Sequence, residues 1–585
     1  MNERVLLPDV LKPKKRILIE LRPALEGFAG IPQEVRLLFR SLRAGTSNEV
    51  QGLLQTYFTM LARGTRSLGD GRPDPGIPDA KRFNAFSRII VSMMKPTEPN
   101  RTIVERILDR IRLRISGALL AMATLLGFGT VRLSNFEPLF FEDFVWRQLF
   151  QKSLPADDFS LVTSATLKIC SIPWRVMHSV GLMTLWLLST PRYPKLDTRG
   201  FDVFICQTPY PGRMKAGTAL VVRYHDAIPL FLPHTIPDKS MHQATHFRAL
   251  QANVKAGAYF ACVSEASRAA LLAVFPEAEK RAITLHNLVS HNYYAENSPR
   301  ERAAEIVRSR LLGRDTEALD HELSPKFQNL GEQEQFYRTA LDRHSLKFLL
   351  IVCSIEPRKN HARLIAAWET LMAETDPDMK LVVVGTLGWD FAHLLKSFRI
   401  WTDRGRLFML NSVPAAELRV LYRHASATVC PSLAEGFDFS GVESMRCGGI
   451  TVASDIPAHR EIYNDAAEYF DPYSTGSLVS ALKRVIYDAN AVANRERLRI
   501  RGAEVSARYT EDKILPQWDA FLEQVCGNRK RPMPATITLQ LGEAPTNPAQ
   551  VILPASGGGE PLPQETAGSA IKADRQGGGT ETGSA

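Results

Sequence analysis

Residues 427–455, ATVCPSLAEGFDFSGVESMRCGGITVASD, contain two short apolar runs separated by a loop and a stretch of helical length. The runs at 427–430 and 450–454 have the length and the β-branched content of buried strands. The loop ends near Gly441, where we expect a helix to begin. A strand, a helix and a second strand in this order predict a pair of parallel strands, because such a pair needs a long crossover connection.

The same alternation extends through the second half of the chain. The runs LKFLLIVCS, KLVVVG and RLFML begin at residues 346, 380 and 406, and each precedes an amphipathic stretch of helical length. Strands that alternate with helices are typical of a doubly wound α/β domain. We therefore expect a Rossmann-like domain over residues 346–527.

The first half begins with a similar unit. An apolar run at 17–21 precedes a loop with Gly27 and Gly30 and an amphipathic stretch at 35–42. Strand-like runs return at 201–207, 219–226, 260–265 and 282–287, separated by helix-like stretches at 239–255 and 266–274. This pattern predicts another Rossmann-like domain over residues 1–292.

Three segments fall outside the alternation. Residues 85–198 are helix-prone, with basic and apolar stretches in alternation, and we interpret them as a helical insertion in the first domain. Residues 293–345 are charged and helix-prone, which is typical of a connector between domains. Residues 528–585 are rich in glycine and proline and contain no aromatic residue, so we expect a disordered tail.

Composition and charge narrow the class of protein. With 45% hydrophobic and 23% charged residues, the chain has the composition of a globular protein. The net charge of +10 is a small excess for 585 residues, and no aromatic and basic platform for nucleic acid is present. The seven cysteines form no CxxC pair, and the first residues lack the pattern of a secretion signal. We expect a cytoplasmic protein.

The segment 101–131 is a candidate for contact with the inner face of the membrane. Its first part is basic and amphipathic, and its second part, Ile115 to Val131, is apolar but just short of the roughly 20 residues that cross a bilayer. The alternative is a buried helical hairpin.

Charged side chains follow the strand-like runs of the second half, at the edge where parallel sheets bind ligands. Arg358 and Lys359 follow the run that begins at residue 346, and Glu435 and Glu443 follow the run at 427–430. Two adjacent cations can neutralise the charge that develops on a departing diphosphate. A carboxylate such as Glu443 can accept two hydrogen bonds from a ribose diol. These residues indicate a site that removes a sugar from a nucleoside diphosphate.

Two segments resemble a known family. The runs SIEPRKNHARLIAAW, from residue 354, and CPSLAEGFDFSGVESMRCGGITVASDIPAHREIYNDAAEYFDPYS, from residue 430, are similar to the donor half of retaining GT-B glycosyltransferases of family 4. The resemblance implies a GT-B architecture, in which two Rossmann-like doubly wound domains face each other across a cleft. It implies transfer of a hexose, mannose or a related sugar, from a nucleotide sugar to a saccharide or lipid-linked acceptor. No metal is implied.

The resemblance also assigns roles to residues of this chain. Glu435 would contact the transferred sugar and Glu443 the ribose, while Arg358 and Lys359 would bind the diphosphate. In the first domain, the run VVRYHDAIPLF places His225 beside the donor sugar. The nucleotide-binding set that the resemblance implies consists of Glu443, Gly436, Phe437, Ser440, Gly441 and Gly30.

Two other interpretations stay open. The family commonly has glycine and proline where this chain has Asp438 and Ser440, so a non-catalytic subunit that binds sugar nucleotides is the alternative function. For single residues, an Arg-Lys pair can be a solvated face, and His225 can be a structural histidine at a strand end.

Overall fold

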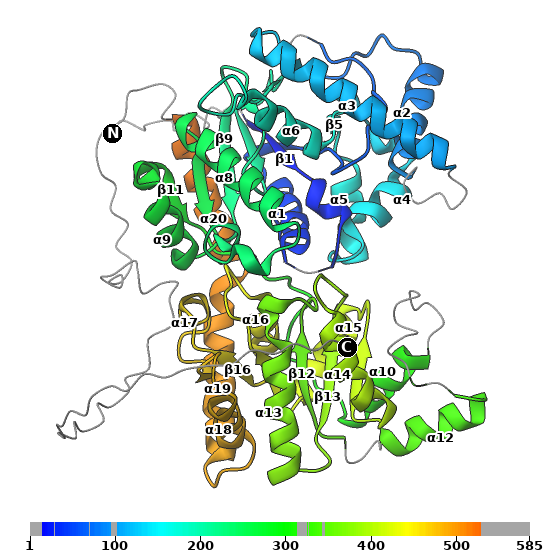
Figure 1. Ribbon diagram of the computed structural model, residues 1–585, viewed down its shortest axis with the longest axis vertical. Helices are drawn as coiled ribbons and strands as arrows, with labels where there is room; N and C mark the ends of the chain where they lie inside the picture. Colours follow the sequence, from blue (N-terminus) through cyan, green and yellow to red (C-terminus); the bar gives the residue numbers. More distant parts are fainter. Residues whose placement is uncertain are drawn as a thin grey trace, which may run out of the picture. The chain divides into compact units, whose positions relative to one another are not determined.

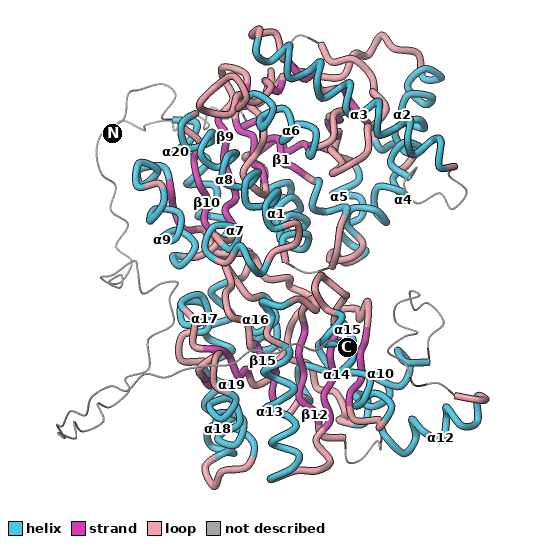
Figure 2. Tube along the Cα trace, viewed as in Figure 1, coloured by secondary structure: helices cyan, strands magenta, loops and turns pink. Residues whose placement is uncertain are grey.

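The computed structural model describes residues 14–28, 30–68, 71–94, 102–312, 325, 327–341 and 346–527 of the chain. The expected tail at 528–585 lies outside these residues, as do parts of the expected connector. Two mainly parallel sheets, each covered by helices on both faces, account for most of the rest (Figures 1 and 2).

The first sheet has eight strands in the order β11-β10-β9-β7-β1-β2-β5-β4. All neighbouring strands pair in parallel except β4, which is antiparallel to β5. The strands are β1 (Lys15–Glu20), β2 (Asn48–Leu54), β4 (Ser134–Phe136), β5 (Leu167–Ile169), β7 (Val203–Cys206), β9 (Ala219–Tyr224), β10 (Tyr259–Cys262) and β11 (Ala282–Thr284). The expected strands at 17–21, 201–207, 219–226, 260–265 and 282–287 are therefore confirmed.

Helices cover both faces of this sheet (Figure 2). One hydrophobic core includes residues of α1 (Ile31–Ala44) and α2 (Asp79–Met94), and a second, on the opposite face, includes residues of α6 (Trp174–Thr184), α8 (Lys239–Lys255) and α9 (Glu265–Val274). The expected helices at 239–255 and 266–274 are thus present. Burial of apolar side chains from both faces of a parallel sheet is what makes its strands read as continuous apolar runs.

The sequence predicted a helical insertion at 85–198, but the segment is not purely helical. It contains α3 (Ile103–Leu125), but β5 pairs with β2 and β4 pairs with β5, so the segment also extends the sheet. Each of these strands has only three residues, too few for the sequence pattern to mark them. Strand β2 also escaped notice, because Asn48, Glu49 and Gln51 interrupt its apolar run.

The second sheet has six parallel strands in the order β14-β13-β12-β15-β16-β17. They are β12 (Phe348–Val352), β13 (Lys380–Val384), β14 (Leu407–Leu410), β15 (Ala427–Cys430), β16 (Thr451–Ser454) and β17 (Ala467–Phe470). The helices between and after them are α13 (His361–Glu374), α14 (Ala392–Asp403), α15 (Ala415–His424), α16 (Phe439–Arg446), α17 (Pro457–Tyr463), α18 (Thr475–Ile486) and α19 (Ala491–Ser506). This is the doubly wound domain that the alternation predicts.

The expected connector packs against this second sheet. Its helices α10 (Glu301–Leu312) and α12 (Leu330–Ala340) contribute Ala303, Val307 and Tyr337 to the same core as Phe348 and Leu350 of β12. Alanine and valine among the charged residues of α10 form the apolar stripe that allows this packing.

The last helix that the structure describes, α20 (Glu511–Gly527), packs in the core of the first domain and not in the second, where the sequence had indicated it. Its buried residues Ile514, Trp518, Phe521, Leu522 and Val525 join the core of the first sheet. They recur at helical spacing and form one apolar face, which needs a hydrophobic surface to cover it. That surface is provided by the first sheet.

The chain passes between the two cores at two neighbouring places. Leu288 lies in the first core and Val289 in the second, while Tyr509 lies in the second and Ile514 in the first. The backbone N–H of Val289 donates a hydrogen bond of 2.9 Å to the carbonyl oxygen of Tyr509, so the two passages are bonded to each other.

Candidate functional site

The site is built at the carboxyl ends of β12 and β15, which are neighbours in the second sheet. Arg358 and Lys359 lie in a short 3₁₀ turn, Pro357–Lys359, that follows β12. Glu435 lies in the loop that follows β15 and precedes α16. Ligands of open parallel sheets bind at this edge, where loops from adjacent strands bring their side chains together.

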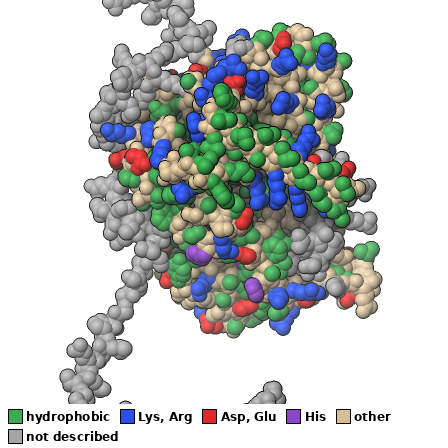
Figure 3. Space-filling view, turned by 45° about the horizontal axis from the view of Figure 1, so that its top comes forward, with side chains coloured by type: hydrophobic (Ala, Val, Ile, Leu, Met, Phe, Trp, Pro, Cys, Tyr) green, Lys and Arg blue, Asp and Glu red, His purple; other side chains and the backbone are tan. Residues whose placement is uncertain are grey.

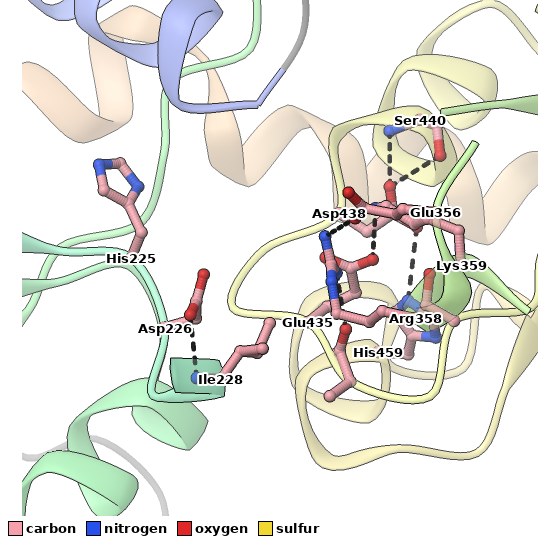
Figure 4. A network of polar contacts seen from close by, with 12 residues as sticks. His225, Asp226, Ile228, Glu356, Arg358, Lys359, Glu435, Asp438, Ser440 and His459 are labelled. Atoms are coloured by element: carbon pink, nitrogen blue, oxygen red, sulfur yellow. Dashed lines mark hydrogen bonds and ion pairs between the residues drawn. The ribbon is translucent and has the colours of Figure 1, made fainter. Parts of the chain in front are cut away.

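Glu435 is held between the two cations (Figure 4). Its Oε2 lies 2.8 Å from Nη1 of Arg358, and its Oε1 accepts a hydrogen bond from Nζ of Lys359. Burial opposes the ionisation of Glu435, but the charges of Arg358 and then Lys359 outweigh it and lower the pKa of the carboxyl group. The second amino group of Arg358, Nη2, is 2.6 Å from Oε1 of the buried Glu356. Both cations are thus aligned by carboxylates.

Asp438 caps the amino terminus of α16. Its Oδ1 accepts hydrogen bonds from the backbone N–H of Ser440, at 3.0 Å, and from the Ser440 hydroxyl, at 2.7 Å. Nε2 of His459 lies 3.4 Å from Oδ2 of Asp438. Burial raises the pKa of Asp438, but the hydrogen bond with His459 and the charge of Lys359 outweigh it and hold the pKa far below its usual value. The anion-binding end of this helix therefore already carries a carboxylate.

Helix α16 begins at Phe439, two residues earlier than the sequence indicated, so Glu443 lies in the second helical turn and not in the first. Its Oε1 accepts a hydrogen bond of 2.8 Å from Nε2 of Gln33, and its Oε2 one of 3.0 Å from the hydroxyl of Tyr422. Burial raises the pKa of Glu443 to about 7, although the hydrogen bonds from Gln33 and Tyr422 lower it. The carboxyl group can therefore change its charge near neutral pH.

Two glycines are required by close packing. A Cβ on Gly436 would lie 1.7 Å from the carbonyl oxygen of His225, and a Cβ on Gly441 would lie 2.3 Å from the ring of Tyr463. Any larger residue at Gly436 would push the Glu435 loop away from the end of β9. Gly436 and Gly441 thus fix the path of the backbone around the glutamates.

Two further predicted residues, Phe437 and Gly30, have other surroundings. Phe437 is buried and packs against Phe439 and Tyr509 in the second core, so its side chain has a structural role there. Gly30 is exposed and precedes α1 with a φ of 71°, a backbone conformation that favours glycine.

His225 follows β9, and its ring lies apart from the Arg358 and Glu435 cluster (Figure 4). Its Nε2 is 3.2 Å from Oε1 of Gln207. Burial, and secondarily the charge of Arg223, lowers the pKa of His225 well below its usual value, so the imidazole is neutral. It is the backbone of His225, through its contact with Gly436, that adjoins the loop of Glu435.

Several residues of the site were missed in the sequence. Asp226 interacts electrostatically with Arg358 and Glu435, and Glu356, Gln33, Tyr422 and His459 contact the predicted residues. Asp226 and Glu356 could have been found, because Asp226 directly follows His225 and Glu356 is two positions before Arg358. Gln33 is 410 positions from Glu443, and no local pattern connects them.

Part of the chain is similar to known proteins. Residues 333–505 match the model of a family described as "Glycosyl transferases group 1". The chain is 30% identical over 141 residues to O-antigen chain mannosyltransferase B of Escherichia coli, which is 24% of this chain and 37% of that protein. It is also 30% identical over 152 residues to the serotype-specific mannosyltransferase WbdA of Escherichia coli, covering 26% of this chain and 18% of WbdA. The chain thus spans well under half the length of these curated relatives.

Solved structures give weaker likenesses. Alr3699/HepE of Anabaena, in complex with UDP and glucose, superimposes with a TM-score of 0.41 at 16% identity, covering 55% of this chain and 78% of that chain. Sucrose-phosphate synthase from Thermosynechococcus elongatus gives a TM-score of 0.48 at 13% identity, covering 88% and 100%.

Two doubly wound domains in one chain, with the charged site in the second, form the GT-B architecture that the sequence resemblance implies. The matched segment includes Arg358, Lys359, Glu435 and Glu443. The second domain is thus similar, over residues 333–505, to the family described as glycosyl transferases group 1.

Proposed function

We propose that the protein is a retaining glycosyltransferase that moves a hexose, mannose or a related sugar, from a nucleoside diphosphate sugar to a saccharide or lipid-linked saccharide. The observation that carries the proposal is the buried arrangement of Arg358, Glu435 and Lys359 at the carboxyl ends of β12 and β15. The resemblance to mannosyltransferases of O-antigen synthesis supports mannose as the sugar and polysaccharide synthesis as the setting.

The charges suit departure of a diphosphate. Before any donor binds, Arg358 and Lys359 both form ion pairs with Glu435, and Arg358 also forms one with Glu356. When a hydroxyl of the donor sugar hydrogen-bonds to Glu435, the two cations can interact less strongly with Glu435 and more strongly with the diphosphate. Pre-positioned charges of this kind act most strongly on the charge that develops in the transition state. Retention follows when the acceptor attacks from the face of the leaving group, with a diphosphate oxygen accepting its proton.

The residues that would hold the donor are those that the family resemblance assigns. Glu443 would accept hydrogen bonds from the ribose diol, and the segment from Gly436 to Gly441 would adjoin the diphosphate together with Gly30. In this scheme the two cations supply the positive charge at the diphosphate, and we propose that no metal ion is needed.

A panel of ligands tests the proposal. GDP, UDP and their mannose and glucose derivatives are added singly while the melting temperature is measured, because a ligand that binds only the folded state stabilises it by about 2.7 kcal/mol at 100 times its Kd. We expect at least one of them to raise the melting temperature and to be hydrolysed or transferred. A protein that binds a nucleotide sugar without ever cleaving it is the non-catalytic subunit that Asp438 and Ser440 leave as the alternative. A protein that binds none of them contradicts both functions.

Binding of the nucleoside diphosphate is expected to strengthen as the pH rises from 6 to 8. Glu443 has a pKa of about 7, so it is mostly protonated at the lower pH and ionised at the higher one, and only the ionised form accepts two hydrogen bonds from a diol. The groups around it are Asp438, Tyr293, Tyr422 and Cys447, of which Asp438 raises its pKa.

Calorimetric titrations at several pH values measure this dependence. The terminal phosphate of the nucleotide also titrates, with a pKa of about 6 for such groups. The Glu443→Gln variant is therefore the control, because it keeps the contribution of the phosphate and loses that of the carboxyl group. Equal pH profiles for the two proteins would show that Glu443 does not titrate in the binding reaction.

We also propose that the protein acts at the cytoplasmic face of the membrane and contacts it through α3. The helix carries large side chains that are exposed, which argues against the alternative of a buried hairpin. The exposed hydrophobic residues on α3 are Ile103, Val104, Ile107, Leu108, Ile111, Ile115, Leu119 and Met122, and Leu126 and Phe128 follow it. Hydrophobic side chains form a broad patch on the face shown in Figure 3, with Lys and Arg side chains along its border.

Neighbouring features suit an interface. Helix α6 packs against α3, and Trp186 and Leu187 just after it are 90% and 75% exposed. Four arginines of α3, Arg106, Arg110, Arg112 and Arg114, supply positive charge for anionic headgroups. Among the described residues, no helix is long and apolar enough to span a bilayer. An amphipathic helix that lies in the interface plane needs no such length.

Replacing Ile111 and Leu119 together by glutamate is expected to reduce binding to vesicles of phosphatidylglycerol at least tenfold. The two side chains are 48% and 62% exposed, so the change removes apolar surface from the interface and adds negative charge without disturbing a core. Flotation of the protein with vesicles measures binding. The difference between vesicles of phosphatidylglycerol and of phosphatidylcholine gives the part of the binding that depends on lipid charge.

The matched control is Val492→Glu with Ile500→Glu on α19, which makes the same change of charge at exposed positions of another helix. Equal loss of binding in the two double variants would contradict a docking role for α3.

A further inference from the structure

Glu443 already has hydrogen-bond donors from both domains in the structure. Besides Tyr422 and Gln33, the side chain of Tyr293 also hydrogen-bonds to it. Tyr422 donates from α15 of the second domain, and Gln33 donates from the first turn of α1 in the first domain. Glu443 and Gln33 are 3% and 6% exposed. A ribose diol that is to hydrogen-bond to this carboxylate must therefore displace one of these donors or bind beside them.

Tyr422 and Gln33 differ in how firmly they are held. Tyr422 is fully buried in the second core, where its ring lies 6.2 Å from that of Tyr293. It sits in the same domain as Glu443 and cannot leave without opening that core. Gln33 reaches Glu443 across the contact between the domains, on a flexible side chain. Its amide is thus the donor that a ligand can displace.

We infer that Gln33 is a positioning residue that occupies the place of the ribose diol in the ligand-free protein and is exchanged for it when the nucleotide binds. The inference rests on the proposed role of Glu443. In the free protein the Gln33 amide keeps the buried carboxylate hydrogen-bonded, which avoids the cost of about 1–3 kcal/mol for an unsatisfied buried acceptor. When a nucleotide enters, its diol takes over this function, and one contact between the domains is lost.

If this exchange takes place, removal of the buried hydrogen bond from Gln33 to Glu443 should improve binding of the nucleotide. In Gln33→Met the side chain keeps its length and loses its donor, so the nucleotide no longer competes with the amide. We expect the affinity for GDP or UDP, whichever the wild-type protein binds, to rise about tenfold at pH 8.5, which corresponds to 1.4 kcal/mol. The gain should be measured at this pH because Glu443 is ionised there.

Tyr422→Phe is the matched control, because it also removes one donor from Glu443. The nucleotide does not displace Tyr422, so this variant should bind it no more tightly than the wild type does. Both donors lower the pKa of Glu443. Both variants should therefore move the midpoint of the pH dependence of binding upward. Only the Gln33 variant should also gain affinity at pH 8.5, a gain that a merely structural role for Gln33 would not produce.

Calorimetric affinity at pH 8.5, the pH profile of affinity and the melting temperature are measured for the wild type, Gln33→Met and Tyr422→Phe. A second substitution, Gln33→Ala, covers the case in which the methionine does not fit. Weaker binding by the Gln33 variants would mean that the amide contacts the nucleotide, and unchanged binding would mean that no exchange takes place. Either result overturns the inference and leaves the proposed function standing. Absence of nucleotide binding in the wild type overturns both.

Discussion

Arg358→Ala and Lys359→Ala are each expected to lower the rate constant for sugar transfer by about a hundredfold or more, as pre-positioned electrostatic groups do when they are removed. The two cations lie on either side of Glu435, where a diphosphate would depart. The negative charge on that group grows as the glycosidic bond breaks, so the loss should appear in kcat more than in donor affinity.

The two substitutions should differ in their effect on stability. Arg358→Ala leaves Glu356 without a cationic partner at 2% exposure, whereas Lys359→Ala leaves Glu435 paired with Arg358. An uncompensated buried charge costs about 3–5 kcal/mol. We therefore expect Arg358→Ala to melt at a lower temperature than Lys359→Ala.

Steady-state kinetics at a temperature below both melting points separate the two effects. Arg358→Lys is a useful companion, because lysine keeps the charge but loses the two-pronged geometry that reaches Glu356 and Glu435 together. Unchanged kcat with a raised KM in the alanine variants would assign both cations to ground-state binding.

The two glutamates should separate in a binding experiment. Glu443→Gln is expected to weaken binding of the bare nucleoside diphosphate at pH 8, because an amide accepts fewer hydrogen bonds from a diol and carries no charge. Glu435→Gln should not weaken it, since the sugar is absent from this ligand and the substitution removes a negative charge from between two cations. Transfer should fall in both variants, by about a hundredfold for Glu435→Gln.

Calorimetry with the diphosphate, beside a transfer assay with the whole donor, distinguishes the roles. If Glu435→Gln weakens the bare nucleotide as much as Glu443→Gln does, the first glutamate does not contact the sugar. The melting temperatures of both variants serve as the control for folding, because both carboxylates are buried.

The sequence predicted those parts of the site that adjacent strands determine. Buried parallel strands appear as apolar runs, so β12 and β15 were recognisable, and their side-by-side pairing brings Arg358 and Lys359 to Glu435. The contacts that were missed depend on tertiary packing. Gln33 meets Glu443 only because the first domain packs on the second, and no short pattern encodes a pair 410 positions apart.

The same reason explains the errors in the fold. The apolar stripe of α20 predicts that the helix packs on something, but it does not identify the first sheet as its partner. The apolar face of α3 has a similar pattern, yet most of its large hydrophobic side chains are exposed. Periodicity shows that a helix has an apolar side, and only the folded chain shows what covers it.

The return of α20 to the first domain restricts how the two domains can move. The covalent passages at Leu288–Val289 and between Tyr509 and Ile514 are tied together by the Val289 to Tyr509 hydrogen bond. Because the two passages are joined at this hydrogen bond, we expect any movement of one domain against the other to be centred there. A first domain prepared without residues 511–527 would lose the buried Trp518 from its core, so the two domains cannot be separated by one cut through the chain.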